Sequence, residues 1–223
     1  YDINSSYPHK AAEKRLPYGK PIAEYGEGKH PIMSKFWIAE ALVRFKLKPS
    51  CIPCIPASKI LEGRPKNDNS KWIADSQGIV KIRFCNIDYQ TIQQSYDFEV
   101  VRWKWSIHWK WKVHKEIAKF VHNNNDNKVK YKKLAKETED EDKKIEYLTI
   151  SNRAKIDNNS FYGKFGEEIV KIGKTPYLDE DGEDVYWEMD REDIQSEGKR
   201  KFLPVAIAIT AWGRQQLVEM ANT

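Results

Sequence analysis

The first half of the chain carries stretches of apolar, β-branched and aromatic residues that are typical of β-strands. Residues 36–45 and 78–87 are two such stretches, and the polar residues 65–70 between them predict a loop. Residues 102–112 alternate strictly, with Trp or Ile at every second position and mainly basic residues between them. As a strand, this run would place its aromatic side chains on one face and its basic side chains on the other.

The second half shows the periods of helices and of a hairpin. Residues 128–159 are polar and favour helix, while the asparagine-rich residues 124–127 predict a break before them. Residues 170–178 and 184–189 flank an Asp-Glu-Asp-Gly turn and predict a β-hairpin. Residues 204–220 predict a helix with an apolar face.

The N-terminal residues 1–8 are expected to end a strand and turn, because Pro8 restricts Tyr7 to extended geometry. A short helical run over residues 9–15 follows, and Leu-Pro-Tyr-Gly then breaks it. Further along the chain, one set of residues recurs at helical spacing: Ile145, Leu148, Asn152, Lys155, Asn159 and Tyr162.

Length, composition and charge limit the function classes. With 223 residues, 40% hydrophobic and 32% charged, the chain can bury a substantial core. It has no apolar stretch near the roughly 20 residues of a membrane span, and its polar start is no signal peptide. Three cysteines, an odd number, favour a reducing compartment. A net charge of +5 permits a polyanionic partner without requiring one.

Two motifs stand in order along the chain: YDINSSYP at residues 1–8 and KIDNNSFYG at residues 155–163. They resemble the first two signature motifs of family B DNA polymerases, Asp-x-x-Ser-Leu-Tyr-Pro of the palm and Lys-x-x-x-Asn-Ser-x-Tyr-Gly of the fingers. The long gap between them, and TAWGR at residues 210–214, resemble the protein-primed branch of phages and linear plasmids. Because the chain begins without Met and inside a motif, we expect it to be a piece of a longer protein.

The resemblance implies a DNA-directed DNA polymerase that adds deoxynucleotides by two-metal nucleotidyl transfer. Asp2 would be the catalytic ligand of Mg²⁺ or Mn²⁺, with the backbone carbonyl of Ile3 on the same ion, and Ser5 would contact DNA. Tyr7 would lie under the nucleotide sugar and exclude a 2′-hydroxyl group. The residues alone also fit an Asp in a strand-to-turn junction and a buried Tyr. Ser6, where the family prefers Leu, is a mild departure.

Lys155, Asn159 and Tyr162 stand at positions i, i+4 and i+7, so they share one helix face. The resemblance makes Lys155 a ligand of the triphosphate, Asn159 and Tyr162 nucleotide contacts, and Gly163 a point where the template approaches. The alternative is a solvated polar face.

A second phosphate-binding lysine is expected upstream of this face. Lys143 fits the spacing of the family and Lys144 fits the helical phase, and the sequence leaves both open as nucleotide ligands. The extended, charged stretch over residues 128–144 is a departure from the family that blurs this assignment.

Two further regions are expected to contact DNA. Thr210, Gly213 and Arg214 share one helical turn, in which Gly213 admits a strand and Arg214 reaches a phosphate; the resemblance makes this turn a primer–template contact. On the alternating strand, Lys104 and Lys110 would grip nucleic acid beside aromatic residues. The duller alternative puts the aromatic residues in a core and the lysines in water.

Two other patterns carry less weight. Cys51 and Cys54 lack a second ligand pair for zinc, since Cys85 is single, and lack a βαβ context for redox chemistry. Residues 177–181 resemble the third polymerase motif, Tyr-x-Asp-Thr-Asp, but they precede residues 210–214, which the true motif should follow. We expect them to form the turn of the second family insertion instead.

We expect an α+β fold with a partial antiparallel palm sheet, a mainly β insertion, helical fingers and a small β-hairpin insertion. The expected boundaries are palm motif 1–15, palm remainder and first insertion 16–113, fingers 114–166, second-insertion hairpin 167–201 and truncated palm helix 202–223. Since the third motif, the thumb and the exonuclease are missing, we expect the isolated chain to be inactive and to hold Mg²⁺ weakly.

The expected partners are primer–template DNA, deoxynucleoside triphosphates and a terminal priming protein, with no membrane, in the cytoplasm of a bacterial host cell. One alternative is a non-catalytic module that binds nucleic acid or a partner on a polymerase scaffold. Another is an ordinary basic α+β domain whose motif matches are accidental. A Tyr-x-Asp-Thr-Asp motif soon after Thr223 would favour the polymerase.

Overall fold

The computed structural model of the chain describes residues 6–65, 69–166, 171–178, 185–192 and 202–222. A five-stranded antiparallel sheet, in the order β1-β5-β2-β4-β3, combines with helices and confirms the expected α+β class. Its strands are β1 Leu16–Tyr25, β2 Phe36–Leu47, β3 Ile60–Glu62, β4 Val80–Cys85 and β5 Tyr96–Lys112, with a 3-10 turn η1 Ala57–Lys59 before β3. The strands predicted near residues 36–45 and 78–87 are therefore present.

Aromatic rings from three neighbouring strands fill the core of this sheet. Trp37 is fully buried, and its ring centroid lies 5.9 Å from that of Phe84 and 5.7 Å from that of Trp103. The hydroxyl of Tyr96 donates to the carbonyl of Ile73 and accepts from the N–H of Cys54, so it fastens the loop that precedes β3. Large rings of this kind contribute most of the apolar area that a small sheet buries.

The alternation predicted for residues 102–112 holds only in part. Trp103 and Trp109 are buried as expected, but Ser106 and His108, on the face expected to be basic and solvated, are buried as well. The loop before β2 covers that face, and the N–H of Ile32 donates to His108 Nε2 over 3.1 Å. Irregularities in the β2–β5 pairing also break the two-residue period.

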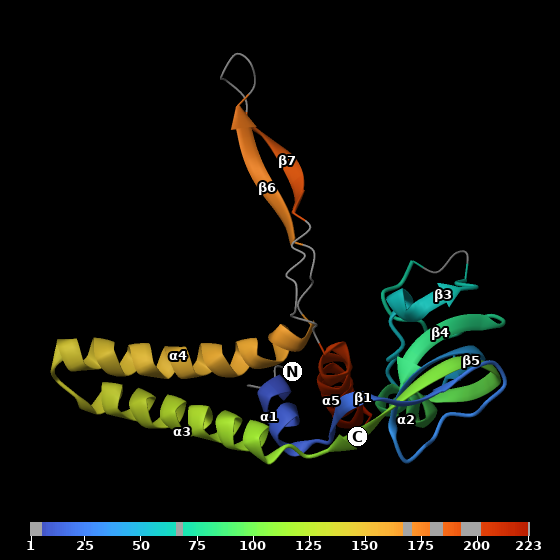
Figure 1. Ribbon diagram of the computed structural model, residues 1–223, viewed down its shortest axis with the longest axis horizontal. Helices are drawn as coiled ribbons and strands as arrows, with labels where there is room; N and C mark the ends of the chain where they lie inside the picture. Colours follow the sequence, from blue (N-terminus) through green and yellow to red (C-terminus); the bar gives the residue numbers. More distant parts are fainter. Residues whose placement is uncertain (1–5, 66–68, 167–170, 179–184, 193–201, 223) are drawn as a thin grey trace.

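Two helices lie between the sheet and the rest of the molecule (Figure 1): α1 Ser6–Glu13 and α5 Leu203–Ala221. The prediction of an extended turn was wrong for residues 6–8, because Tyr7 and Pro8 already lie in α1, where the first helical turn tolerates proline. The helix predicted at residues 204–220 is confirmed as α5. Its apolar side packs, with α1 and β1, on the sheet residues Phe36, Cys85 and Trp109 and on Ile87 of the helix that follows β4.

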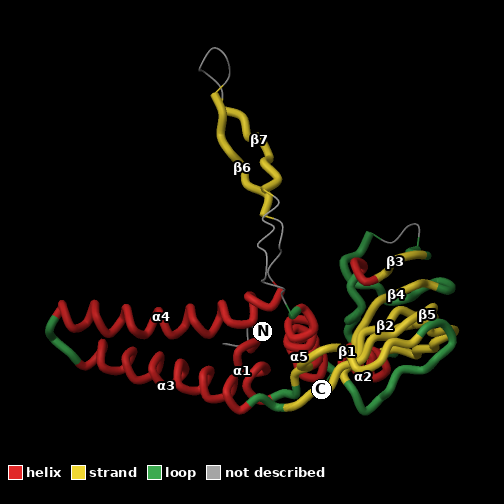
Figure 2. The backbone as a smooth tube through the Cα atoms, in the orientation of Figure 1, coloured by secondary structure: helices red, strands yellow, loops and turns green. Residues whose placement is uncertain are grey.

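Helices α3 Lys115–Glu137 and α4 Glu141–Gly166 form a long antiparallel hairpin on the side of α1 and α5 away from the sheet (Figure 2). The break predicted at residues 124–127 was wrong, because α3 runs through it. The single helical stretch predicted over residues 128–159 is divided instead at residues 138–140. There Asp140 Oδ1 accepts the N–H groups of Asp142 and Lys143 and so caps α4.

The predicted β-hairpin is also present, as β6 Lys171–Leu178 paired with β7 Val185–Glu192, and it projects away from the other elements (Figure 1). The turn between the two strands, including the sequence like the third polymerase motif at residues 179–181, lies outside the described residues. The remaining helix, α2 Asn86–Ser95, follows β4 and lies against α5. Within the described part of the chain, no helix is long and apolar enough to cross a membrane.

Candidate functional site

Three helices that are far apart in sequence meet at Tyr7. Its ring centroid lies 4.6 Å from that of Tyr162 in α4, with the planes tilted by 46°. On the other side, α5 approaches so closely that a Cβ atom added to Gly213 would lie 2.9 Å from a ring carbon of Tyr7. The structure therefore brings together residues from all three motifs: Tyr7, Tyr162 and Gly213. Asp2, Ile3 and Ser5 lie outside the described residues.

Next to this contact, α4 presents a polar face to solvent. Lys155 and Asn159 are exposed and line a hollow of about 580 Å³ together with Asn152, Ile156 and Ser160. A lysine ammonium group beside amide and hydroxyl groups suits a phosphate-bearing ligand, because it offers one charge and several hydrogen-bond partners. The shared helix face expected for Lys155 and Asn159 is confirmed, while their roles remain predictions.

The two alternative phosphate-binding lysines lie in the first turn of α4. Lys143 Nζ is 3.5 Å from Asp140 Oδ2, and Lys144 Nζ is 3.0 Å from Glu141 Oε1. The helix is continuous from there to Lys155. Lys143 and Lys155 are twelve residues apart, which corresponds to about 18 Å along the helix axis. Neither lysine lies beside the hollow at Lys155, and the choice between them stays open.

The guanidinium of Arg214 forms a buried ion pair. Its Nε and Nη2 donate to Asp88 Oδ1 over 3.1 and 2.9 Å, and Lys59 bonds the other carboxylate oxygen. Burial would raise the pKa of Asp88, but the charges of Lys59 and Arg214 lower it to about 2. Thr210 donates to the carbonyls of Ala206 and Ile207 within its own helix.

The Asp88 carboxylate and the cations around it border a cavity of about 330 Å³. Lys59, Arg83, Asp88 and Arg214 all line this cavity. Sequence reasoning missed Lys59 and Asp88, which stand 155 and 126 positions before Arg214. The only available signal was a carboxylate in the first turn of a helix, which is common and carries no function by itself. The DNA contact predicted for Arg214 therefore has to use a guanidinium that Asp88 already holds from one side.

The basic residues of β5 are partly neutralised. Arg102 and Lys104 both donate to the same oxygen, Glu27 Oε1, over 3.1 and 2.9 Å. The hydrogen bonds from Lys104 and Arg102 lower the pKa of Glu27. Lys110 is exposed, and its backbone pairs with Tyr18 of β1. Of the two predicted DNA-binding lysines on this strand, Lys104 thus carries a local counter-charge.

Two of the three cysteines lie in the interior of the protein. Cys54 and Cys85 are buried, and burial raises the pKa of Cys54 to about 11 and that of Cys85 to about 12. No group of three or more His, Cys, Asp or Glu side chains suited to a metal ion occurs among the residues that the structure describes. The metal ligand predicted at Asp2 falls outside those residues.

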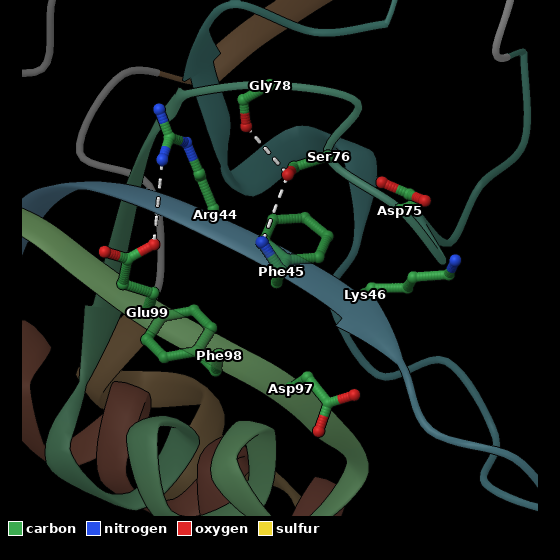
Figure 3. A pocket seen from close by; sticks show the side chains of 9 residues that line it. All are labelled: Arg44, Phe45, Lys46, Asp75, Ser76, Gly78, Asp97, Phe98 and Glu99. Atoms are coloured by element: carbon green, nitrogen blue, oxygen red, sulfur yellow. Dashed lines mark hydrogen bonds and ion pairs between the residues drawn. The ribbon is translucent and has the colours of Figure 1, made fainter.

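A second hollow, of about 440 Å³, lies at the far end of the sheet (Figure 3). Ser76 closes one side of it, since its Oγ accepts from the N–H of Phe45 and donates to the carbonyl of Gly78. Arg44 faces Glu99 across two strands at 3.9 Å. The basic and acidic side chains that line this hollow are mixed, so the hollow has no clear preference for an anion or for a cation.

Comparisons with known proteins agree with this geometry. Residues 1–205 match the model of a family described as DNA polymerase type B, organellar and viral. The DNA polymerase of Bacillus phage B103 is 28% identical over 226 residues, and that of Streptococcus phage Cp-1 is 26% identical over 224 residues. Both alignments use the whole of this chain, which spans 36% of the Cp-1 protein and 35% of the B103 protein.

The fold is similar to a solved structure of phi29 DNA polymerase in complex with primer–template DNA and incoming nucleotides. The TM-score is 0.69 at 24% sequence identity, over 99% of this chain and 35% of that one. A second structure of the same polymerase, with primer–template DNA alone, gives the same TM-score and identity.

Proposed function

Because the chain belongs to the type B DNA polymerases of organelles and viruses, we propose that it supplies the palm and fingers of a DNA-directed DNA polymerase. The whole protein would add deoxynucleotides to a primer and start its replication from a terminal priming protein, in the cytoplasm of a bacterial host. The convergence of Tyr7, Tyr162 and Gly213 carries this proposal, since it unites the three polymerase-like motifs in one place.

In this proposal the incoming nucleotide occupies the space between α1 and α4. Tyr7 forms the floor under the sugar, and its packing against Tyr162 and Gly213 leaves the ring little freedom to move. Lys155 holds the triphosphate, while Asn159 and Tyr162 contact the nucleotide. Fixed cationic groups of this kind accelerate transfer because they are oriented before charge develops in the transition state.

The metal ions of the reaction would be Mg²⁺ or Mn²⁺, held by the carboxylate of Asp2 and the carbonyl of Ile3. Both residues precede α1, which starts at Ser6 and carries Tyr7. Such ions stabilise the attacking and leaving oxygens of the displacement. Ligands beyond Asp2 and Ile3 would have to come from regions of the relatives that this chain does not span.

Contacts to primer–template DNA are assigned to Ser5, Gly163, Thr210, Arg214, Lys104 and Lys110. Gly163 has open space around its Cα, which suits the close approach of a strand. Arg214 reaches DNA from the cavity that it shares with Lys59, and the surface formed by β5 adds positive charge. Backbone contacts of this kind position DNA without reading its sequence.

The test is primer extension by the whole protein with Mg²⁺ and all four deoxynucleoside triphosphates. Asp2→Asn is expected to abolish extension while leaving primer–template binding nearly unchanged, since the substitution removes the metal ligand and keeps the shape. Lys155→Ala is expected to raise the nucleotide requirement and to slow transfer, by about 2–4 kcal/mol of transition-state stabilisation. Extension by Asp2→Asn at the wild-type rate would contradict the assignment.

A non-catalytic binding module on a polymerase scaffold remains the second candidate. Such a module would bind DNA but would not elongate a primer even as the whole protein. We propose that this chain alone binds nucleic acid weakly and does not elongate a primer. Processive product from the purified chain that disappears on Asp2→Asn would overturn that proposal and would make Asp179 and Asp181 candidates for metal ligands.

A further inference from the structure

The α3–α4 hairpin packs along a seam with the spacing of a coiled coil. Buried and half-buried seam residues recur at alternating intervals of four and three in α4: Tyr147, Ser151, Ala154, Asn158, Phe161 and Phe165. In α3 the corresponding series is Val121, Asn124, Lys128, Tyr131 and Ala135. Side chains at this spacing stay on one face over many turns, so the two helices can pack side by side along their length.

One position in the middle of this seam is polar. Asn158 is only 4% exposed. Both the oxygen and the nitrogen of its side-chain amide form hydrogen bonds with α3. Its Oδ1 accepts from Asn124 Nδ2 over 3.2 Å, and its Nδ2 donates to the carbonyl of Val121 over 3.3 Å. The polymerase-like motif, which fixes Lys155 and Asn159, leaves the position of Asn158 open.

The other residues of the seam would pack almost equally well in more than one register of α4 against α3. Ala154 and Val121 are small and apolar, and aromatic pairs such as Tyr131–Tyr147 and Phe120–Phe161 recur along it. Sliding α4 along the seam would again set small and aromatic side chains of the same series against one another. The paired amides are satisfied in only one register, because elsewhere each buried amide would face carbon and lose its partners.

The register of α4 decides where the nucleotide-binding side chains point. Lys155 precedes Asn158 by three residues and Asn159 follows it by one, so all three rotate and slide together with the helix. A shift by one helical turn moves each of them by about 5.4 Å. Such a shift would move Lys155 relative to Tyr7 and would also carry Tyr162 away from its contact with Tyr7.

We propose that Asn158 and Asn124 are positioning residues that fix the register of α4 and thereby set the position of Lys155 and Asn159 relative to Tyr7. This rests on the proposed nucleotide-binding function of that face. The pair specifies the arrangement at a cost in stability, since a leucine pair in the same seam would bury more apolar surface. A merely structural pair would instead stabilise the hairpin and influence catalysis only through stability.

The experiment compares variants of the whole protein by nucleotide KM, kcat and Tm. The double variant Asn124→Leu with Asn158→Leu is expected to keep or raise Tm while raising the nucleotide KM by roughly 10-fold to 100-fold, as misplacements of about 1 Å can do. Asn124→Ala, which leaves the bond from Asn158 to Val121, is expected to give a smaller rise. Ser151→Ala is the matched control: it removes another seam hydrogen bond, to the carbonyl of Lys128, and should leave KM unchanged.

Three results would overturn the proposal: a double variant with wild-type KM, a rise in KM that Ser151→Ala reproduces, or a rise that occurs only with a fall in Tm. If the double variant does not fold, Asn124→Ala decides by the same criteria. Lys155→Ala separates this proposal from the function on which it rests. If that substitution leaves KM unchanged, the nucleotide-binding assignment fails; if it raises KM while the asparagine variants do not, only the positioning role fails.

Discussion

Arg214 and Asp88 form a buried ion pair between α5 and the start of α2, with two guanidinium nitrogens on a single carboxylate oxygen. Lys59 bonds the second oxygen, so one carboxylate joins α5, α2 and the turn before β3. The turn of α5 that holds Thr210 and Arg214 is therefore anchored to the sheet through the Asp88 carboxylate, a residue that is only 5% exposed. A carboxylate with two cationic partners is charged in the folded state throughout the neutral range, as its lowered pKa indicates.

Asp88→Ala is expected to lower the free energy of unfolding by at most about 3–5 kcal/mol, because it leaves Lys59 and the partly exposed Arg214 without their shared counter-charge. Urea denaturation of variant and wild type measures this directly. Glu62→Ala removes an exposed ion pair with Lys81 and serves as the control, with an expected loss below about 1 kcal/mol. Equal effects of the two substitutions would show that the Asp88 pair adds nothing beyond a surface contact.

Acidification is expected to destabilise the protein through His108. Burial lowers the pKa of His108 below its ordinary value of 6.5, although the hydrogen bond with the carbonyl of Ala23 opposes this. A lowered folded-state pKa means that the stabilising contribution is fully present above the unfolded pKa and is lost as the pH falls below it. The Tm should fall between pH 8 and pH 5, and it should fall less in His108→Asn than in the wild type. An identical pH dependence of Tm in both proteins would show that His108 is not responsible.

Glu27→Gln is expected to tighten DNA binding, because it releases Arg102 and Lys104 from a shared carboxylate oxygen. Each phosphate newly contacted by these groups should steepen the dependence of log K on log salt by about 0.9. Fluorescence anisotropy with a primer–template duplex at several salt concentrations measures both quantities. Glu62→Gln changes the charge equally at the other edge of the sheet, and a matching gain there would point to net charge rather than to Glu27.

Gly213→Ala is expected to weaken nucleotide binding without loss of stability. Alanine favours helix over glycine by about 1 kcal/mol, yet its Cβ would lie 2.9 Å from the Tyr7 ring and would displace it. Nucleotide KM and discrimination against ribonucleotides are the measurements. If Gly213→Ala acts by displacing Tyr7, the double variant Gly213→Ala with Tyr7→Val should have the same nucleotide KM and the same discrimination as Tyr7→Val alone. Additive effects of the two substitutions would show that Gly213→Ala does not act through Tyr7.

Sequence reasoning succeeded where a local period or a motif determined the outcome. The strands β2 and β4 are runs of apolar residues, α5 has a consistent apolar face, and the spacing of Lys155 and Asn159 fixes a common face once α4 is helical. The resemblance of the two motifs also united Tyr7 with Tyr162, which are 155 positions apart.

It failed where distant contacts override local preference. Asn124 has a turn-forming side chain, but pairing with Asn158 keeps it inside α3. His108 follows a pattern that predicts a solvated position, but the loop around Ile32 covers it. Asp88 and Lys59 become part of the site only through Arg214, and no periodicity in the sequence indicates that meeting.

The position of α5 at the end of the described chain has a consequence for synthesis on the ribosome. Its residues Val205, Ala208 and Ile209 cover an apolar surface that includes Phe36 and Trp109. At ordinary elongation rates, roughly 5–20 s pass between translation of Trp109, which completes that surface, and translation of α5. Throughout that interval the nascent chain carries an uncovered hydrophobic surface, which makes it a client for ribosome-associated chaperones and makes stalling before residue 203 a route to aggregation.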